Sequence, residues 1–228
     1  MTPNPAIPIM LNLQHRHISI IGGGSVAHRR AKKLIAVGAQ VTLIAPHINT
    51  PFPPNAKIIQ KKYAPDDIKN AFLVIAATDN PALNQQVLAD AKAQGILVSA
   101  ADDPSQSDLQ FLAHHTQGPI TLAVHTQAIS PSIATQIRDQ LAENLPDYWQ
   151  QALQILKPIR KKLQEKIQDP LTRNALLKSL ASPENLAKLQ TQGLQAYTLH
   201  CQKIYDQAIA NQTPKTFSHT PPDPSPPR

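Results

Sequence analysis

The sequence is poor in the residues that build several common kinds of functional site. Cys201 is the only cysteine in 228 residues, which excludes an internal disulfide, a CxxC redox pair and a multi-cysteine metal site, and suits a reducing cytoplasm. Aromatic residues make up 4% of the chain, too few for platforms that stack single-stranded nucleic acid. No apolar run approaches the roughly 20 residues that span a bilayer, and the N-terminus does not resemble a signal peptide. We expect a cytoplasmic protein that binds neither membrane nor nucleic acid.

Negative charge is also scarce relative to positive charge. The chain has 22 Lys and Arg against 15 Asp and Glu, for a net charge of +7. A basic surface attracts anions such as nucleic acid, anionic lipid or a polycarboxylated small molecule, and charge alone does not choose among them. The basic stretch at residues 157–166 (KPIRKKLQEK) has no aromatic neighbours, which disfavours nucleic-acid recognition and is typical of a solvated helix face.

Strand-like and helix-like segments alternate in the first half of the chain. Short apolar or β-branched runs predict five strands, at residues 17–21, 41–45, 56–60, 72–77 and 96–100. Apolar residues at helical spacing predict helices at residues 26–37 and 81–94. Repeated strand–helix units of this size predict an α/β fold, a Rossmann-like domain with a parallel sheet.

The second half of the chain has a different pattern. Residues 119–124 predict one more strand, and Ser130 with Pro131 opens a helix. The helix carries one apolar face, formed by Ile133, Ile137 and Leu141. Because such a face needs a partner, we expect it to join two copies in a homodimer. The expected organisation is an NAD-binding Rossmann domain at 1–113, a dimerisation segment at 114–147, a helical C-terminal domain at 148–213 and a disordered proline-rich tail at 214–228.

A glycine-rich turn follows the first predicted strand and opens the first predicted helix. The stretch GGGSVA fits the dinucleotide-binding pattern GxGxxG/A with Gly22, Gly24 and Ala27. The first glycine permits a tight turn, the second lets a diphosphate approach the backbone, and the helix N-terminus supplies donors. The alternative is a glycine-rich turn that only packs.

The ends of the second and fourth strands hold further candidate cofactor contacts. Pro46 and His47 stand where an acid usually binds the adenosine ribose, and no Arg is placed there for a 2′-phosphate. The motif alone leaves the cofactor open, but the missing Arg favours NAD over NADP. Thr78 and Asp79 follow the fourth strand, where they can contact the cofactor; the alternative is simple helix capping, with Asn80 or Asp79 as the cap of the next helix.

Two carboxylates and three histidines complete the set of candidate reactive groups. Asp102 and Asp103 follow the fifth strand, where a carboxylate pair can do acid–base chemistry or hold a metal. Adjacent side chains point in different directions, so we expect one to face the cleft and the other to cap a turn. His114, His115 and His125 invite a metal-site hypothesis, but no carboxylate has fixed ligand spacing with them, so we expect hydrogen-bonding roles and no metal site.

Four stretches in this order resemble the precorrin-2 dehydrogenase / sirohydrochlorin ferrochelatase family, the N-terminal module of siroheme synthases. The resemblance covers roughly residues 6–165 and rests on IGGGSVAHRRAKKL, AATDNPALNQQV, ILVSAADDP and SPSIATQIRDQL. It implies NAD-dependent oxidation of precorrin-2 to sirohydrochlorin, in many members Fe²⁺ insertion to give siroheme, and a homodimer. It assigns the key carboxylate to Asp102 and cofactor contacts to Ser25, Val26, Pro46 and His47.

Two segments depart from the pattern of that family. Residues 108–113 (DLQFLA) lack the family's aromatic and proline in their usual places, and residues 125–129 (HTQAI) replace a Ser/Thr-Gly-Gly turn. Without glycine, a turn with positive φ is disfavoured, so we expect an altered tetrapyrrole pocket. The departures keep an alternative open, in which a divergent paralogue binds a tetrapyrrole or metal as a chelatase-only or regulatory protein without dehydrogenase activity.

Overall fold

A computed structural model describes residues 6–48 and 51–211, and the tail predicted at 214–228 lies outside the described residues. The chain divides into two compact units. Of the described residues, the first unit comprises 6–48, 51–112 and 125–131, and the second comprises 113–124 and 132–211. Each unit is described separately below.

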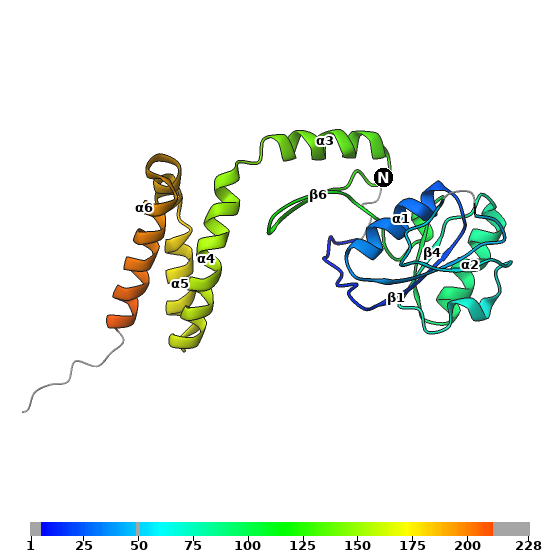
Figure 1. The fold of residues 1–228 in the computed structure, drawn as a ribbon, viewed down its shortest axis with the longest axis horizontal. Coiled ribbons are helices and arrows are strands. Elements are labelled where there is room, and N and C mark those ends of the chain that lie inside the picture. The colour runs from blue at the N-terminus through cyan, green and yellow to red at the C-terminus, as the bar shows by residue number, and fades with distance from the viewer. Residues whose placement is uncertain (1–5, 49–50, 212–228) are drawn as a thin grey trace, which may run out of the picture. The chain divides into compact units, whose positions relative to one another are not determined.

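The first unit contains a parallel five-stranded sheet with the strand order β3-β2-β1-β4-β5 (Figure 1). The strands are β1 (His17–Ile21), β2 (Gln40–Ile44), β3 (Lys57–Ile59), β4 (Leu73–Ala76) and β5 (Leu97–Ala100). They confirm the five predicted strands and the predicted α/β, Rossmann-like fold. The chain leaves β1 toward β2 and β3, then returns to place β4 on the other side of β1. The order of the strands therefore reverses at β1, where doubly wound folds bind their ligands.

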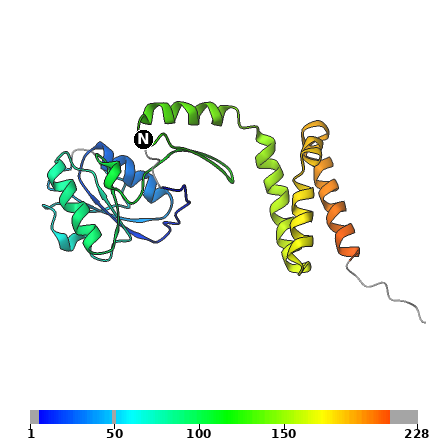
Figure 2. The ribbon, with the colours of Figure 1, turned by 180° about the vertical axis from the view of Figure 1, so that it is seen from behind.

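Helices α1 (Ser25–Ala36) and α2 (Pro81–Ala93) cover opposite faces of this sheet (Figures 1 and 2). Consecutive residues of β4 point to opposite faces of the sheet. Leu73 belongs to the apolar cluster that contains residues of α1, and Val74 belongs to the cluster that contains residues of α2. Burial on both faces explains why β4 is an unbroken apolar run. The carboxyl ends of the strands are held by this double-sided core.

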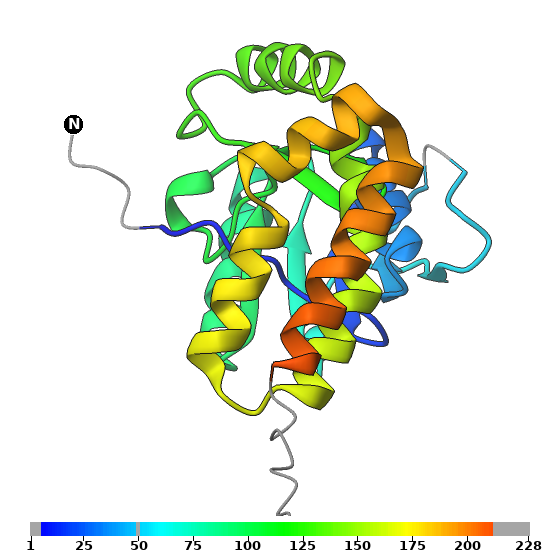
Figure 3. The same ribbon diagram turned by 90° about the vertical axis from the view of Figure 1, so that its left-hand side faces the viewer.

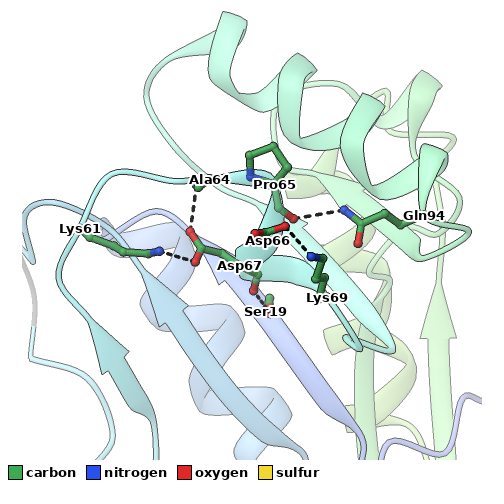
Figure 4. Close-up of polar contacts among 8 residues, drawn as sticks. All are labelled: Ser19, Lys61, Ala64, Pro65, Asp66, Asp67, Lys69 and Gln94. Carbon is green, nitrogen blue, oxygen red and sulfur yellow. Dashed lines mark hydrogen bonds and ion pairs between the residues drawn. The ribbon is translucent and has the colours of Figure 1, made fainter.

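The short 3₁₀ turn η1 (Pro65–Ile68) is pinned to the sheet by one carboxylate (Figure 4). Asp67 accepts a hydrogen bond from the backbone N–H of Ala64 at 2.8 Å and pairs with Lys61 at 2.5 Å. The carbonyl oxygen of Asp67 accepts a hydrogen bond from Ser19 Oγ at 3.4 Å. Ser19 is fully buried in β1, so η1 satisfies a polar group that burial would otherwise penalise.

The second unit begins with an antiparallel hairpin of β6 (Ala113–Gln117) and β7 (Ile120–Val124). Strand β7 and helix α3 (Pro131–Glu143) were expected, but β6 was not. Its sequence AHHTQ is largely polar, and its strand conformation comes from pairing with β7, which a local pattern does not reveal. The helix leaves Ile133, Ile137 and Leu141 exposed by 52%, 38% and 49%.

Three further helices pack side by side in this unit (Figure 3). They are α4 (Asp147–Lys166), α5 (Pro170–Leu180) and α6 (Pro183–Ala210), the last interrupted at Gly193, where φ is 83°. Asp169 and Ser182 cap α5 and α6, which divides the single helical region expected from the sequence. Tyr197 and Cys201 are fully buried in the shared core. No helix among residues 6–48 and 51–211 is long and apolar enough to cross a membrane.

Candidate functional site

The predicted site residues all follow strands of the parallel sheet. Gly22–Val26 follow β1, Pro46 and His47 follow β2, Thr78 and Asp79 follow β4, and Asp102 follows β5. Because the strands are parallel, the structure brings these residues to one edge of the sheet. Ligands of open α/β sheets bind at this carboxyl edge.

The three consecutive glycines serve different purposes in the turn after β1. Gly22 has φ of 131°, and a Cβ there would stand 2.2 Å from the carbonyl oxygen of Ala77. A Cβ on Gly23 would stand 2.1 Å from the carbonyl oxygen of His47. A Cβ on Gly24 would meet no atom within 4 Å. The first two glycines therefore let three loops meet, and the third borders open space.

That open space lies at the N-terminus of α1. Gly24 is the N-cap of this helix, no side chain caps it, and its first turn contains no acidic residue. The first N–H groups of a helix have no intrahelical partner and favour an anion. The residues present thus fit the diphosphate of a dinucleotide, with Ser25 and Val26 at the first two helical positions. The sequence pattern did not single out Gly23, because glycine is required there by the loop that contains His47.

The polar residues after β4 divide between helix capping and the sheet edge. Asn80 is the N-cap of α2, and its side chain accepts a hydrogen bond from the N–H of Leu83 at 3.2 Å. Thr78 is half-buried, and Asp79 is exposed. The capping role that the sequence left open thus belongs to Asn80, while Asp79 stays a predicted cofactor contact.

The two adjacent carboxylates after β5 have different surroundings. Asp103 caps the 3₁₀ turn η2 (Pro104–Gln106) and accepts hydrogen bonds from Ser105 N at 3.1 Å and Ser105 Oγ at 2.5 Å. The hydroxyl of Ser105 is the main cause that lowers the pKa of Asp103. Asp102 takes no part in this cap, and its Oδ2 accepts a hydrogen bond from Asn84 Nδ2 at 2.9 Å. The capping role expected for one of the pair thus falls to Asp103.

Asn84 is the polar residue that the sequence interpretation missed. It is fully buried on the inner face of α2, beside Val87 and Leu88. Its amide contacts Thr78 as well as Asp102, so it joins the loops that follow β4 and β5. The available signal was an asparagine at a position where the helix pattern requires an apolar residue.

Comparison with known proteins indicates one family. Residues 9–113 match a family model described as "Putative NAD(P)-binding". Siroheme synthase 1 of Aeromonas hydrophila is 29% identical over 194 residues, and the siroheme synthase of Nitrosococcus oceani is 33% identical over 166 residues. These matches cover 83% and 71% of this chain but 42% and 36% of those proteins. Among solved structures, the precorrin-2 dehydrogenase SirC matches with a TM-score of 0.65 at 24% identity, over 90% of this chain and 100% of that chain.

The chain is similar to siroheme synthases over 71–83% of its own length. It spans less than half the length of the two siroheme synthases compared above. The likeness to SirC confirms the expected arrangement of a Rossmann-like domain followed by a helical region. The family model supports the prediction that this protein uses NAD.

The two segments that depart from the family pattern contact each other in this module. His125 Nε2 hydrogen-bonds Gln110 Oε1 at 2.7 Å, and Gln110 Nε2 donates to the carbonyl oxygen of Pro104 at 3.2 Å. His114 and His115 lie on β6, in the other unit. Within the described ranges, no group of three or more His, Cys, Asp or Glu side chains could hold a metal ion. The structure thus gives His125 a hydrogen-bonding role beside the loop that carries Asp102.

The turn after His125 keeps a backbone path that favours glycine, although it contains none. Gln127 and Ala128 have φ of 51° and 60°, and Ile129 N donates to Thr126 O at 2.9 Å. Two consecutive positive φ values closed by such a bond are the pattern of a type I′ turn. The loss of both glycines has therefore not moved the backbone out of the left-handed region in this module.

We expect the double variant Gln127→Gly/Ala128→Gly to be more stable than the wild type. The left-handed conformation costs each L residue roughly 1–2 kcal/mol, and the greater freedom of unfolded glycine takes back about 0.5–1 kcal/mol of that gain. Chemical denaturation should therefore show a free energy of unfolding higher by about 1 kcal/mol for the pair. Ala128→Val, which puts a β-branched side chain at positive φ, is the control and should lower it. Equal stability of all three proteins would contradict the strained turn.

Proposed function

We propose that this protein oxidises precorrin-2 to sirohydrochlorin with NAD, as a precorrin-2 dehydrogenase. The observation that carries the proposal is the place of Asp102, which stands at the same sheet edge as the glycine turn and its open space. The siroheme synthases above and the precorrin-2 dehydrogenase SirC support the choice of substrate. The net charge of +7 suits a substrate that carries many carboxylates.

The residues at the carboxyl edge of the sheet have two roles in this proposal, which are binding of the cofactor and transfer of a proton. The N–H groups of α1 and the space beside Gly24 hold the diphosphate, with Ser25 and Val26 next to it. Pro46, His47, Thr78 and Asp79 are the further proposed contacts. NAD, when bound, supplies the hydride acceptor. Asp102 takes the proton that leaves the substrate as the hydride departs.

Iron insertion is a proposed second reaction of the same site. Metal insertion must remove two pyrrole N–H protons, and the carboxylate of Asp102 is placed to accept a proton at this edge. Fe²⁺ is then a substrate and needs no resident metal site. The single buried cysteine, Cys201, suits the reducing cytoplasm in which we place these reactions.

A second candidate function is favoured by the contact between His125 and Gln110. These residues belong to the two segments that depart from the family pattern, and they face each other at 2.7 Å. The chain would then be a divergent paralogue that keeps the fold but does not oxidise precorrin-2. Such a paralogue would bind a tetrapyrrole or metal, as a chelatase without dehydrogenase activity or as a regulatory protein.

Incubation of the purified protein with precorrin-2, with and without NAD, tests the proposal. We expect the absorbance of sirohydrochlorin to appear only with NAD. A parallel incubation of sirohydrochlorin with Fe²⁺ tests the second reaction. Tetrapyrrole binding without NAD-dependent oxidation would reject the dehydrogenase and favour the paralogue.

We also propose a homodimer that is joined through residues 114–147, the segment that follows the NAD-binding domain in the sequence. Ile133, Ile137 and Leu141 lie on one exposed stripe of α3, and burying such a stripe favours association. Light scattering at micromolar concentration should give twice the mass of the chain. Ile137→Glu should give the monomer, whereas Gln136→Glu, at the preceding, exposed position, should leave the dimer intact. A monomeric wild type would contradict this proposal.

A further inference from the structure

Two consecutive amides on α2 face the two consecutive carboxylates after β5. Asn84 Nδ2 donates to Asp102 Oδ2 at 2.9 Å, and Gln85 Nε2 donates to Asp103 Oδ2 at 3.3 Å. Asn84 is fully buried, whereas Gln85 is exposed. Asn84 therefore has a fixed environment, and the pair of Gln85 and Asp103 provides a natural comparison on the same two elements.

Thr78 fixes the orientation of the Asn84 amide. Asn84 Oδ1 accepts from Thr78 N at 3.1 Å and from Thr78 Oγ1 at 2.7 Å, while Asn84 Nδ2 donates to Thr78 O at 3.1 Å. A flipped amide would place its NH₂ group against the N–H of Thr78 and its oxygen against two acceptors, so the contacts with Thr78 exclude the flip. The direction of the bond to Asp102 is thus set by the loop that follows β4.

One oxygen of Asp102 is engaged and the other is not. Oδ2 accepts from Asn84, and within residues 6–48 and 51–211 no residue donates to Oδ1. An engaged oxygen restricts the rotation of the carboxylate, while the other oxygen can meet a substrate proton. Such restriction is valuable because a small misplacement of a reacting group can reduce a rate about 100-fold.

We propose that Asn84 is a positioning residue that ties Asp102 to Thr78, so that the loop at the predicted cofactor contact sets the orientation of the reacting carboxylate. The inference rests on the proposed function for the role of Asp102, but the hydrogen-bond coupling itself does not. Asn84 acts through Asp102 and contacts no substrate.

Steady-state kinetics with precorrin-2 separate positioning from binding. We expect Asn84→Ala to lower kcat about 10- to 100-fold and to change KM for precorrin-2 less than threefold. Gln85→Ala is the matched control and should keep kcat within twofold of the wild type. A kcat for Asn84→Ala within twofold of the wild type, at equal folded fraction, would overturn the proposal.

A charge swap provides a second kinetic and structural test. Asn84→Asp places a carboxylate against two acceptors, Thr78 O and Asp102 Oδ2, and should lower thermal stability and kcat more than Asn84→Ala. The double variant N84D/D102N again places an amide donor, now at position 102, opposite a carboxylate acceptor at position 84. It should therefore regain stability but not turnover. A swap that regains neither would overturn the pairing.

An NMR measurement tests the coupling without any turnover. The side-chain amide resonances of Asn84, identified by their loss in N84D, should shift in the Asp102→Asn variant and on addition of NAD to the wild type. The side-chain resonances of Gln85 should move less in both cases. Asn84 resonances that respond to neither change would overturn the coupling. A wild type that lacks turnover but shows these shifts would reject only the proposed function.

Discussion

Asp102→Ala is expected to abolish the oxidation of precorrin-2 while leaving NAD binding and folding near normal. The carboxylate stands after β5 at the ligand edge of the sheet and contributes no apolar packing to the core. Positioned acid–base groups contribute about 10²- to 10⁴-fold to a rate, and we expect a loss of that size in kcat. Absorbance assays of sirohydrochlorin formation measure the loss, and NAD titration measures the retained binding.

Asp103→Ala is the matched control for this prediction. Asp103 caps η2 through Ser105, so its loss should lower stability slightly and change kcat little. Full activity of the Asp102 variant would remove this residue from the reaction. Unfolding of that variant would make Asp102 a structural residue.

Gly24→Val is expected to weaken NAD binding about 100-fold without unfolding the protein. The backbone of Gly24 has φ of −91° and ψ of −174°, an extended conformation that valine adopts readily. The new side chain would meet no protein atom at its Cβ, but it would occupy the space beside the N-terminus of α1. Titration with NAD and thermal unfolding measure the two effects separately.

The neighbouring glycine gives the contrasting result. Gly23→Val would bring a Cβ to 2.1 Å from the carbonyl oxygen of His47, so it should lower both the unfolding temperature and NAD affinity. Unchanged NAD affinity in the Gly24 variant would place the nucleotide elsewhere. Equal stability of the Gly23 variant and the wild type would contradict the close approach of the two loops.

Local patterns predicted the sheet well because its signals lie within single segments. The apolar run at β4 and the glycines after β1 each reveal their structure without knowledge of the rest of the chain. Strand β6 was missed because its polar sequence becomes a strand only through pairing with β7. The turn at Gln127 and Ala128 was expected to suffer from the loss of glycine, yet both residues keep positive φ.

The candidate site was predictable to the same extent. The glycine pattern and the strand ends identified the edge where Gly24, Thr78 and Asp102 lie. Gly23 and Asn84 were missed because their importance depends on atoms of distant loops, namely the carbonyl of His47 and the carboxylate of Asp102. A single sequence without structure carries no signal for such contacts beyond an unusual residue on an apolar helix face.

The buried Cys201 gives the helical bundle an internal chemical reporter. It is the single thiol of the chain, it is fully buried beside Tyr197, and burial raises its pKa. A buried, protonated thiol reacts slowly with alkylating reagents, because the thiolate is the nucleophile. The rate of alkylation therefore counts openings of the bundle formed by α4, α5 and α6. Movements confined to the nucleotide-binding sheet leave that rate unchanged. The alkylation rate of the wild-type protein therefore distinguishes opening of the helical bundle from movement of the sheet.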